Sequence, residues 1–143
     1  MRLVLDTNVV MSALLWRGKP YLLLEAIRQR SDVQLVSSAV LLEELADVLT
    51  RPSASKRLAL ISKTVPEVLA DCVDAIKLVE PAEVPRVVPS DADDDHVIAA
   101  AVAAGATLIV PGDADLLSIG RHQGIEIISV AMAAEAVGAT GPA

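Results

Sequence analysis

The chain has 143 residues, a formal net charge of -7 and a composition that is 53% hydrophobic but only 1% aromatic. This length favours a single domain, whose core must be built from aliphatic side chains. The sequence has neither an apolar run long enough to cross a bilayer, about 18 residues, nor a signal peptide, so we expect a cytoplasmic protein without a membrane segment. The single cysteine, Cys72, excludes an intramolecular disulfide and a cysteine-based zinc site, and we expect it to be buried.

The charges are distributed unevenly along the chain. Residues 1–63 hold nine Lys and Arg residues against six acids, and the remainder holds three against thirteen. The overall acidity argues against a strongly basic nucleic-acid binder, but this separation allows an acidic centre with a basic neighbourhood.

Strands and helices are expected to alternate through the first half of the chain. An apolar strand at 2–5 ends at Asp6, and a helix follows within 8–16. A second helix has Pro20 at its start, and a second strand covers 33–37. Ser37 or Ser38 then caps a helix that carries Glu44 and ends before Pro52. Two further helices lead to a third strand around 76–80.

The second half repeats this alternation after a proline-containing connection at 81–91, which we expect to be extended. A helix runs from about Asp94 to Gly105, a fourth strand covers 107–110, and the turn "PGDADLL" leads into a short helix. A fifth strand covers 125–129, and a last helix begins at Val130. The pattern predicts an α/β/α sandwich with a central parallel sheet of about five strands, formed by a single domain at 1–135 and a flexible tail at 136–143.

Carboxylates stand where parallel strands end. Asp6 directly follows the first strand, and Asp113 and Asp115 follow the fourth. Asp94 or Asp95 begins the preceding helix, and Glu44 lies on the helix after the second strand. In such sheets, functional groups collect at the carboxyl ends of the strands, so these acids can converge on one crevice.

A cluster of carboxylates is costly unless a cation neutralises it, and oxygen ligands favour Mg²⁺ or Mn²⁺. A metal held in this way can activate water and bind phosphate oxygens, which is the chemistry of phosphodiester hydrolysis. The simpler alternative is that the acids at 91–95 only cap a helix and interact favourably with the positive end of its dipole. An acid directly after a buried strand, as at Asp6, is harder to explain by structure alone.

Four motifs, in order and spacing, resemble the signatures of PIN-domain proteins. They are "LVLDTNVVMSALL", "SSAVLLEEL" followed by "DVLTRP", "DADDDHVIAAAVAAGA" and "LIVPGDADLL". The resemblance is to the branch that contains VapC-like toxins of type II toxin-antitoxin systems. It implies a Mg²⁺- or Mn²⁺-dependent endoribonuclease on a PIN-like three-layer sandwich.

The resemblance also assigns roles to residues. The catalytic acids fall on Asp6, Glu44, Asp94 and Asp113, and the metal ligands on Asp6, Asp94, Asp113 and Asp115. Glu44 is preferred to Glu43, and counting back from Gly105 selects Asp94, although the motif "IAAA" would select Asp95. Thr7 and Asn8 become polar supports of the site. Pro111 departs from the family pattern, which often has Thr before the Gly-Asp pair.

Partners follow from the same resemblance: an RNA substrate, an antitoxin that blocks the site, and a second copy in a homodimer. Arg17, Lys19 and Arg51 are candidate contacts to the RNA backbone. Trp16 and Tyr21 are the only aromatic residues, so we do not expect a base-stacking platform like that of single-strand binders.

Two alternative functions come from other classes. One is a PIN-like module that binds metal, nucleic acid or a partner without catalysis. The other is a phosphotransfer fold of the receiver or haloacid-dehalogenase type, both of which place Asp after the first strand. The phosphatase pattern requires a second Asp where this chain has Asn8, and the receiver pattern requires a late Lys, which residues 122–143 lack.

Overall fold

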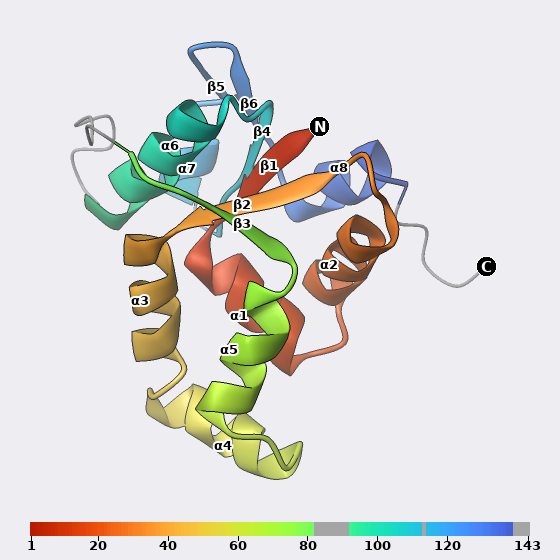
Figure 1. Cartoon of the computed structure of the whole chain (residues 1–143), viewed down its shortest axis with the longest axis vertical. Helices are drawn as coiled ribbons and strands as arrows, with labels where there is room; N and C mark the ends of the chain where they lie inside the picture. The colour runs from red at the N-terminus through yellow and green to blue at the C-terminus, as the bar shows by residue number, and fades with distance from the viewer. Residues whose placement is uncertain (82–91, 113, 139–143) are drawn as a thin grey trace.

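A computed structural model describes residues 1–81, 92–112 and 114–138, with only the backbone for residues 92 and 93. The predicted connection at 81–91 and residues 139–143 of the predicted tail therefore lie almost wholly outside the described residues. Elsewhere strands and helices alternate as expected (Figure 1).

The described sheet has six strands in the order β3-β2-β1-β4-β6-β5. The strands are β1 (Arg2–Leu5), β2 (Gln34–Ser38), β3 (Ile76–Val79), β4 (Leu108–Val110), β5 (Arg121–His122) and β6 (Ile125–Ile127). All neighbouring pairs are parallel except β5 with β6. The prediction of a central parallel sheet is confirmed, but the sheet has one strand more than expected.

The additional strand, β5, belongs to a tight hairpin. Gln123 and Gly124 connect it to β6, and both have positive φ angles, of 49° and 81°. Positive φ at both central residues matches the hairpin turns whose twist suits paired strands. A two-residue strand carries too little alternation to be recognised in the sequence, so this pairing was missed.

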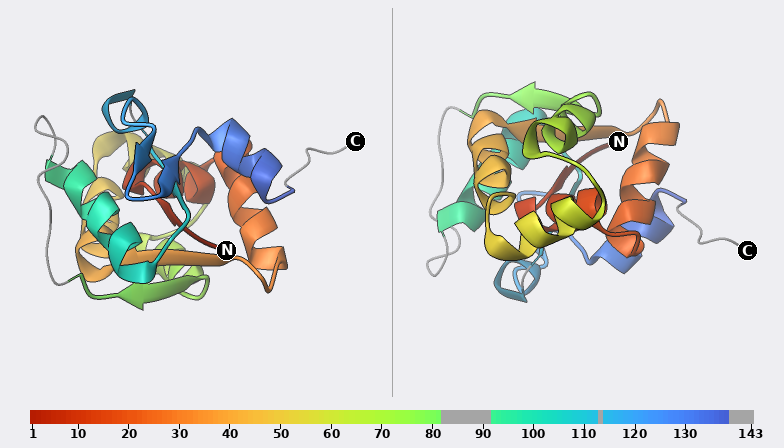
Figure 2. Two further views of the ribbon diagram at one scale, coloured as in Figure 1. Left: turned by 90° about the horizontal axis from the view of Figure 1, so that it is seen from above. Right: turned by 90° about the horizontal axis from the view of Figure 1, so that it is seen from below.

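Helices cover both faces of the sheet (Figure 2). They are α1 (Thr7–Leu15), α2 (Lys19–Gln29), α3 (Ala39–Val48), α4 (Pro52–Leu60), α5 (Val65–Val73), α6 (Ala92–Ala104), α7 (Ala114–Leu117) and α8 (Val130–Ala136). The sheet separates α6 from α2 and α8, and α4 lies at the foot of the molecule against the end of α1 (Figure 1). The three-layer α/β/α arrangement is confirmed.

Alternating side chains of β1 divide the core into two clusters. Leu3 and Leu5 pack with residues of α1, α2 and α8, whereas Val4 packs with residues of α6 and α7. Because both faces of a parallel sheet are covered, its central strands are apolar on both sides. This explains why "LVL" reads as a continuous apolar run.

Local sequence signals explain most helix boundaries. The side chains of Ser38, Thr64 and Ser129 accept hydrogen bonds from backbone N–H groups at the starts of α3, α5 and α8. Proline stands at the beginning of α2, α4 and α5, where no N–H is needed. Val137, just beyond α8, is buried, and its carbonyl oxygen accepts a hydrogen bond from Arg30.

Candidate functional site

Asp6 stands at the carboxyl end of β1 and is the N-cap residue of α1, with only 6% of its surface exposed. Its backbone is held from both sides: its N–H donates to the Val110 carbonyl oxygen at 2.9 Å, and its carbonyl oxygen accepts from Val9 and Val10 at 3.0 Å. The side chain does not cap α1. A rigid backbone therefore presents a buried carboxylate that the helix does not use.

The Asp6 carboxylate is directed across the end of the neighbouring strand. Its Oδ2 accepts a hydrogen bond of 2.9 Å from the backbone N–H of Gly112, which lies two residues beyond β4. A Cβ atom at Gly112 would stand 3.1 Å from the Asn8 Cβ and 3.3 Å from the Asp6 Oδ2. Glycine is thus needed for this close approach, and it fixes one oxygen of the carboxylate.

Two further carboxylates lie on the first turns of α6. Asp94 and Asp95 are exposed by only 2% and 1%, respectively. Carboxylates are rarely buried to this degree, because removing a charge from water is costly. The burial of both residues leaves the choice between Asp94 and Asp95 open.

Glu44 lies on α3 beside a buried stripe formed by Leu41, Leu45 and Val48. Its side chain is half-buried, whereas that of Glu43 is exposed. α3 contacts both α1 and α6, and the first turns of α3 and α6 lie at the same edge of the sheet (Figures 1 and 2). The geometry therefore favours Glu44 over Glu43 as a member of the acidic group.

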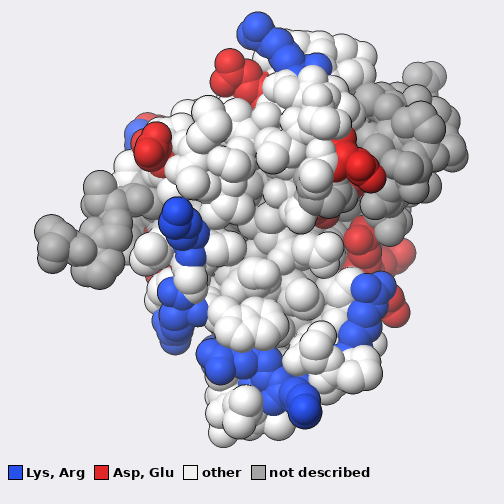
Figure 3. Space-filling model, turned by 180° about the vertical axis from the view of Figure 1, so that it is seen from behind, with Lys and Arg blue, Asp and Glu red and all other residues white. Residues whose placement is uncertain are grey.

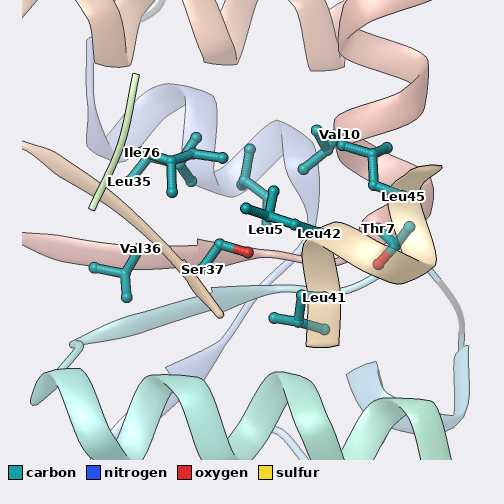
Figure 4. Close-up of a pocket in the computed structure, with 10 residues that line it drawn as sticks. All are labelled: Leu5, Thr7, Val10, Leu35, Val36, Ser37, Leu41, Leu42, Leu45 and Ile76. Carbon is teal, nitrogen blue, oxygen red and sulfur yellow. The ribbon is translucent and has the colours of Figure 1, made fainter. Parts of the chain in front are cut away.

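Thr7 carries a buried hydroxyl next to Asp6. The residue is 3% exposed, and its Oγ1 has no hydrogen-bond partner among the described residues. Thr7 and Ser37 are the polar residues that line a small cavity, of about 10 Å³, beneath the site (Figure 4). A buried hydroxyl without a partner is energetically unfavourable, and such groups are often found at functional sites.

The remaining predicted residues are exposed or lie outside the described residues. Asp115 is exposed on the first turn of α7, and Asp113 lies outside the described residues. Arg17, Lys19 and Arg51 are exposed near the ends of α1 and α3, away from the carboxyl edge of the sheet. Arg51 pairs with Asp47 at 3.4 Å on the surface, a contact of small energetic value.

A metal site formed by three or more His, Cys, Asp or Glu side chains is not found within residues 1–81, 92–112 and 114–138. The predicted set includes Asp113, so this finding does not test it. The donor chemistry fits a hard divalent cation: the buried groups are carboxylate oxygens and the hydroxyl of Thr7, the residue after Asp6.

Sequence reasoning missed the backbone N–H of Gly112 as a functional group. The signal was the "PG" turn after the fourth strand, which brings a residue without a side chain to the sheet edge. The sequence could not show that this N–H would reach an aspartate 106 residues earlier in the chain.

These features define an α/β protein with acidic groups buried at the carboxyl edge of a mostly parallel sheet. Residues 2–115 match the family model of the PIN domain, and the chain belongs to the PIN-domain family. The PIN domain is generally a nuclease fold, and PIN nucleases bind nucleic acid and typically use divalent metals. The matched residues extend from β1 into α7.

A comparison with curated proteins finds no match. Among the described helices, none combines the length and apolar character required to cross a membrane.

Proposed function

We propose that this protein is a Mg²⁺- or Mn²⁺-dependent endoribonuclease and the VapC-like toxin of a type II toxin-antitoxin pair. The observation that carries the nuclease proposal is the buried Asp6 carboxylate, which a backbone N–H holds at the carboxyl edge of a PIN-domain sheet. The toxin assignment rests on the likeness of the four sequence motifs to that branch of the family.

Each acid has a role in this proposal. Asp6, Asp94 and Asp113 hold the divalent ion, with Asp115 as a further ligand, and Asp95 remains an alternative to Asp94. When bound, the ion supplies positive charge that stabilises the phosphoryl oxygens and makes water more acidic. Glu44, half-buried on α3, binds the metal or positions the water.

Preorganisation supports catalysis by these residues. The hydrogen bond from Gly112 fixes the Asp6 carboxylate before any substrate arrives, and the backbone contacts to β4 and α1 prevent it from withdrawing. A group that is held in position spends no energy on reorganisation when charge develops at the phosphate. Burial at this edge also limits competition from bulk water.

The partners follow the same proposal. The protein is a cytoplasmic homodimer, and a cognate antitoxin blocks the acidic crevice until it is removed. RNA approaches with its backbone on the basic residues Arg17, Lys19 and Arg51, since phosphate contacts supply most of the affinity in such complexes. Residues 1–135 form a single catalytic domain.

The experiment that tests the nuclease proposal is cleavage of a structured RNA pool by the purified protein in Mg²⁺, Mn²⁺ or EDTA. We expect cleavage in either metal, none in EDTA, and a loss of more than about 100-fold in Asp6→Asn. Asp94→Asn and Asp95→Asn are compared directly, because only the metal ligand of the two should show the same loss.

Matched variants on α3 provide a control. Glu44→Gln should lower the cleavage rate, whereas Glu43→Gln, next to it on the exposed side of the helix, should leave the rate unchanged. A folded wild-type protein that binds Mn²⁺ but cleaves no RNA would reject catalysis and favour the non-catalytic PIN-like binding module.

A further inference from the structure

Two segments of this acidic chain contain no acid. Residues 7–24 and 48–66 lack Asp and Glu altogether, and together they hold six basic residues. These residues are Arg17, Lys19, Arg51, Lys56, Arg57 and Lys63. A chain with a net charge of -7 therefore keeps half of its positive charge in two short segments.

The structure brings these segments together at the foot of the molecule. Arg57, on α4, donates a hydrogen bond of 2.7 Å from its Nε to the carbonyl oxygen of Leu15, the last residue of α1. α1 and α4 also pack against each other. Arg57 of the second segment is thus held against the end of the first.

The protein has only two aromatic residues, Trp16 and Tyr21, and each carries an arginine. The guanidinium carbon of Arg17 stands 4.4 Å from the centre of the Tyr21 ring, and that of Arg57 stands 5.8 Å from the centre of the Trp16 ring. Trp16 is 40% exposed. We call Trp16, Arg17, Tyr21 and Arg57 the arginine-aromatic corner.

Charge is unevenly distributed over the face shown in Figure 3. Lys and Arg side chains gather at its foot, where α4 lies, and others stand along the left edge, at the right and at the top, whereas Asp and Glu side chains lie on the upper and right-hand parts. α1 connects the acidic site with Trp16 and Arg17, since it begins after Asp6 and ends before Trp16. A helix of this length separates them by about 15 Å, a distance that a few nucleotides can span.

We propose that the arginine-aromatic corner binds single-stranded RNA that extends from the acidic site, with a base stacked on Trp16 and phosphates on Arg17 and Arg57. An exposed aromatic ring beside guanidinium groups is the arrangement that holds single strands, because bases stack and the backbone is neutralised. Two aromatics do not form an extended platform, but one exposed ring is sufficient as an anchor. This inference rests on the proposed ribonuclease function.

Trp16 is the only tryptophan, so its fluorescence reports on the corner directly. The experiment titrates full-length Asp6→Asn, which should not cleave, with a mixed-sequence 12-nucleotide single-stranded RNA and with the corresponding duplex. We expect the single strand to quench the fluorescence and the duplex to quench it weakly. Affinity should fall with salt, since phosphate contacts release counterions.

Variants locate the binding. Arg17→Gln in the Asp6→Asn background should weaken binding of the single-stranded RNA. The slope of log affinity against log salt concentration should fall by about 1, as expected for the loss of one phosphate contact. Trp16→Leu should weaken binding about tenfold, as expected for loss of one stacked base. Arg121→Gln, an exposed arginine on β5, is the matched control and should bind like the parent protein.

The outcomes separate this inference from the proposed function. Quenching and weakened binding in Arg17→Gln support the corner, even if the wild-type protein cleaves no RNA and the nuclease proposal fails. If the wild type cleaves RNA but the fluorescence does not change and both corner variants bind as tightly as Arg121→Gln, the inference is overturned. The arginine-aromatic corner would then be tested as a contact for a protein partner.

Discussion

Gly112 offers a direct test of how the Asp6 carboxylate is held. In Gly112→Ala, the new Cβ would stand 3.1 Å from the Asn8 Cβ and 3.3 Å from the Asp6 Oδ2. Ordinary contacts between carbon atoms are about 3.5–4.0 Å, so a neighbour must move by a few tenths of an ångström. The Asp6 backbone is held by hydrogen bonds to Val110 and α1, and the displacement therefore falls on the carboxylate and on the Gly112 loop.

The expected effect on stability is small. A hydrogen bond to a charged group contributes about 1.5–3 kcal/mol to stability. Lengthening the bond between the Gly112 N–H and the Asp6 carboxylate loses part of this contribution. Replacing glycine by alanine stabilises the folded protein by about 0.4–1 kcal/mol, because it restricts the conformations of the unfolded chain. The net loss should be about 1 kcal/mol, or a fall in Tm of about 4 °C. RNA cleavage should fall by about tenfold or more, because a small misplacement of a catalytic group is costly.

Gly124→Ala is the opposing control. Gly124 has a φ of 81° and open space around it, so alanine there is strained without touching the site. The variant should lose about 1–2 kcal/mol of stability and retain cleavage. Tm by calorimetry and cleavage rates are measured for both variants. Full activity in a folded Gly112→Ala protein would refute the reasoning that this N–H positions Asp6.

Two further predictions concern single buried side chains. Thr7→Val removes the buried hydroxyl that has no partner among the described residues, so Tm should stay equal or rise while RNA cleavage falls; unchanged cleavage would show that the hydroxyl has no role in the site. Burial raises the pKa of the Cys72 thiol to about 11 from its usual 9.0, against the opposing charge of Arg28. Above pH 9 the unfolded chain loses this proton before the folded protein does, so the free energy of unfolding should fall by up to about 3 kcal/mol between pH 9 and 11. Urea titrations across this range should show that fall in the wild type and not in Cys72→Ala.

Most of the fold can be predicted from the apolar runs and the turn residues of the sequence. Continuous runs such as "LVL" predict strands buried on both faces, and the cap at Ser38 and the prolines at helix starts predict helix boundaries. β5 could not be predicted, because its stability comes from pairing with β6 rather than from any pattern within two residues. Local sequence signals predict the longer helices and strands, whereas the formation of the shortest strands depends on tertiary contacts.

The candidate site divides in the same way. Asp6 is identifiable because a carboxylate after a buried strand has no ordinary structural purpose. The deep burial of both Asp94 and Asp95 depends on how α6 packs against the sheet, which their neighbouring positions in the sequence do not reveal. The arginine-aromatic corner was also hidden, because Trp16 and Arg57 lie 41 positions apart and meet only when α4 folds back onto α1.

The strand order has a consequence for the newly made chain as it leaves the ribosome. β1 occupies an inner position between β2 and β4, although it is synthesised before both of them and β4 comes more than a hundred residues later. Until residues 108–112 emerge, β1 has one unpaired edge and Asp6 has no Gly112 beneath its carboxylate. A chain without these residues therefore has the first acid of the site without the strand that positions it, and any activity of this site is withheld until β4 and Gly112 have been made.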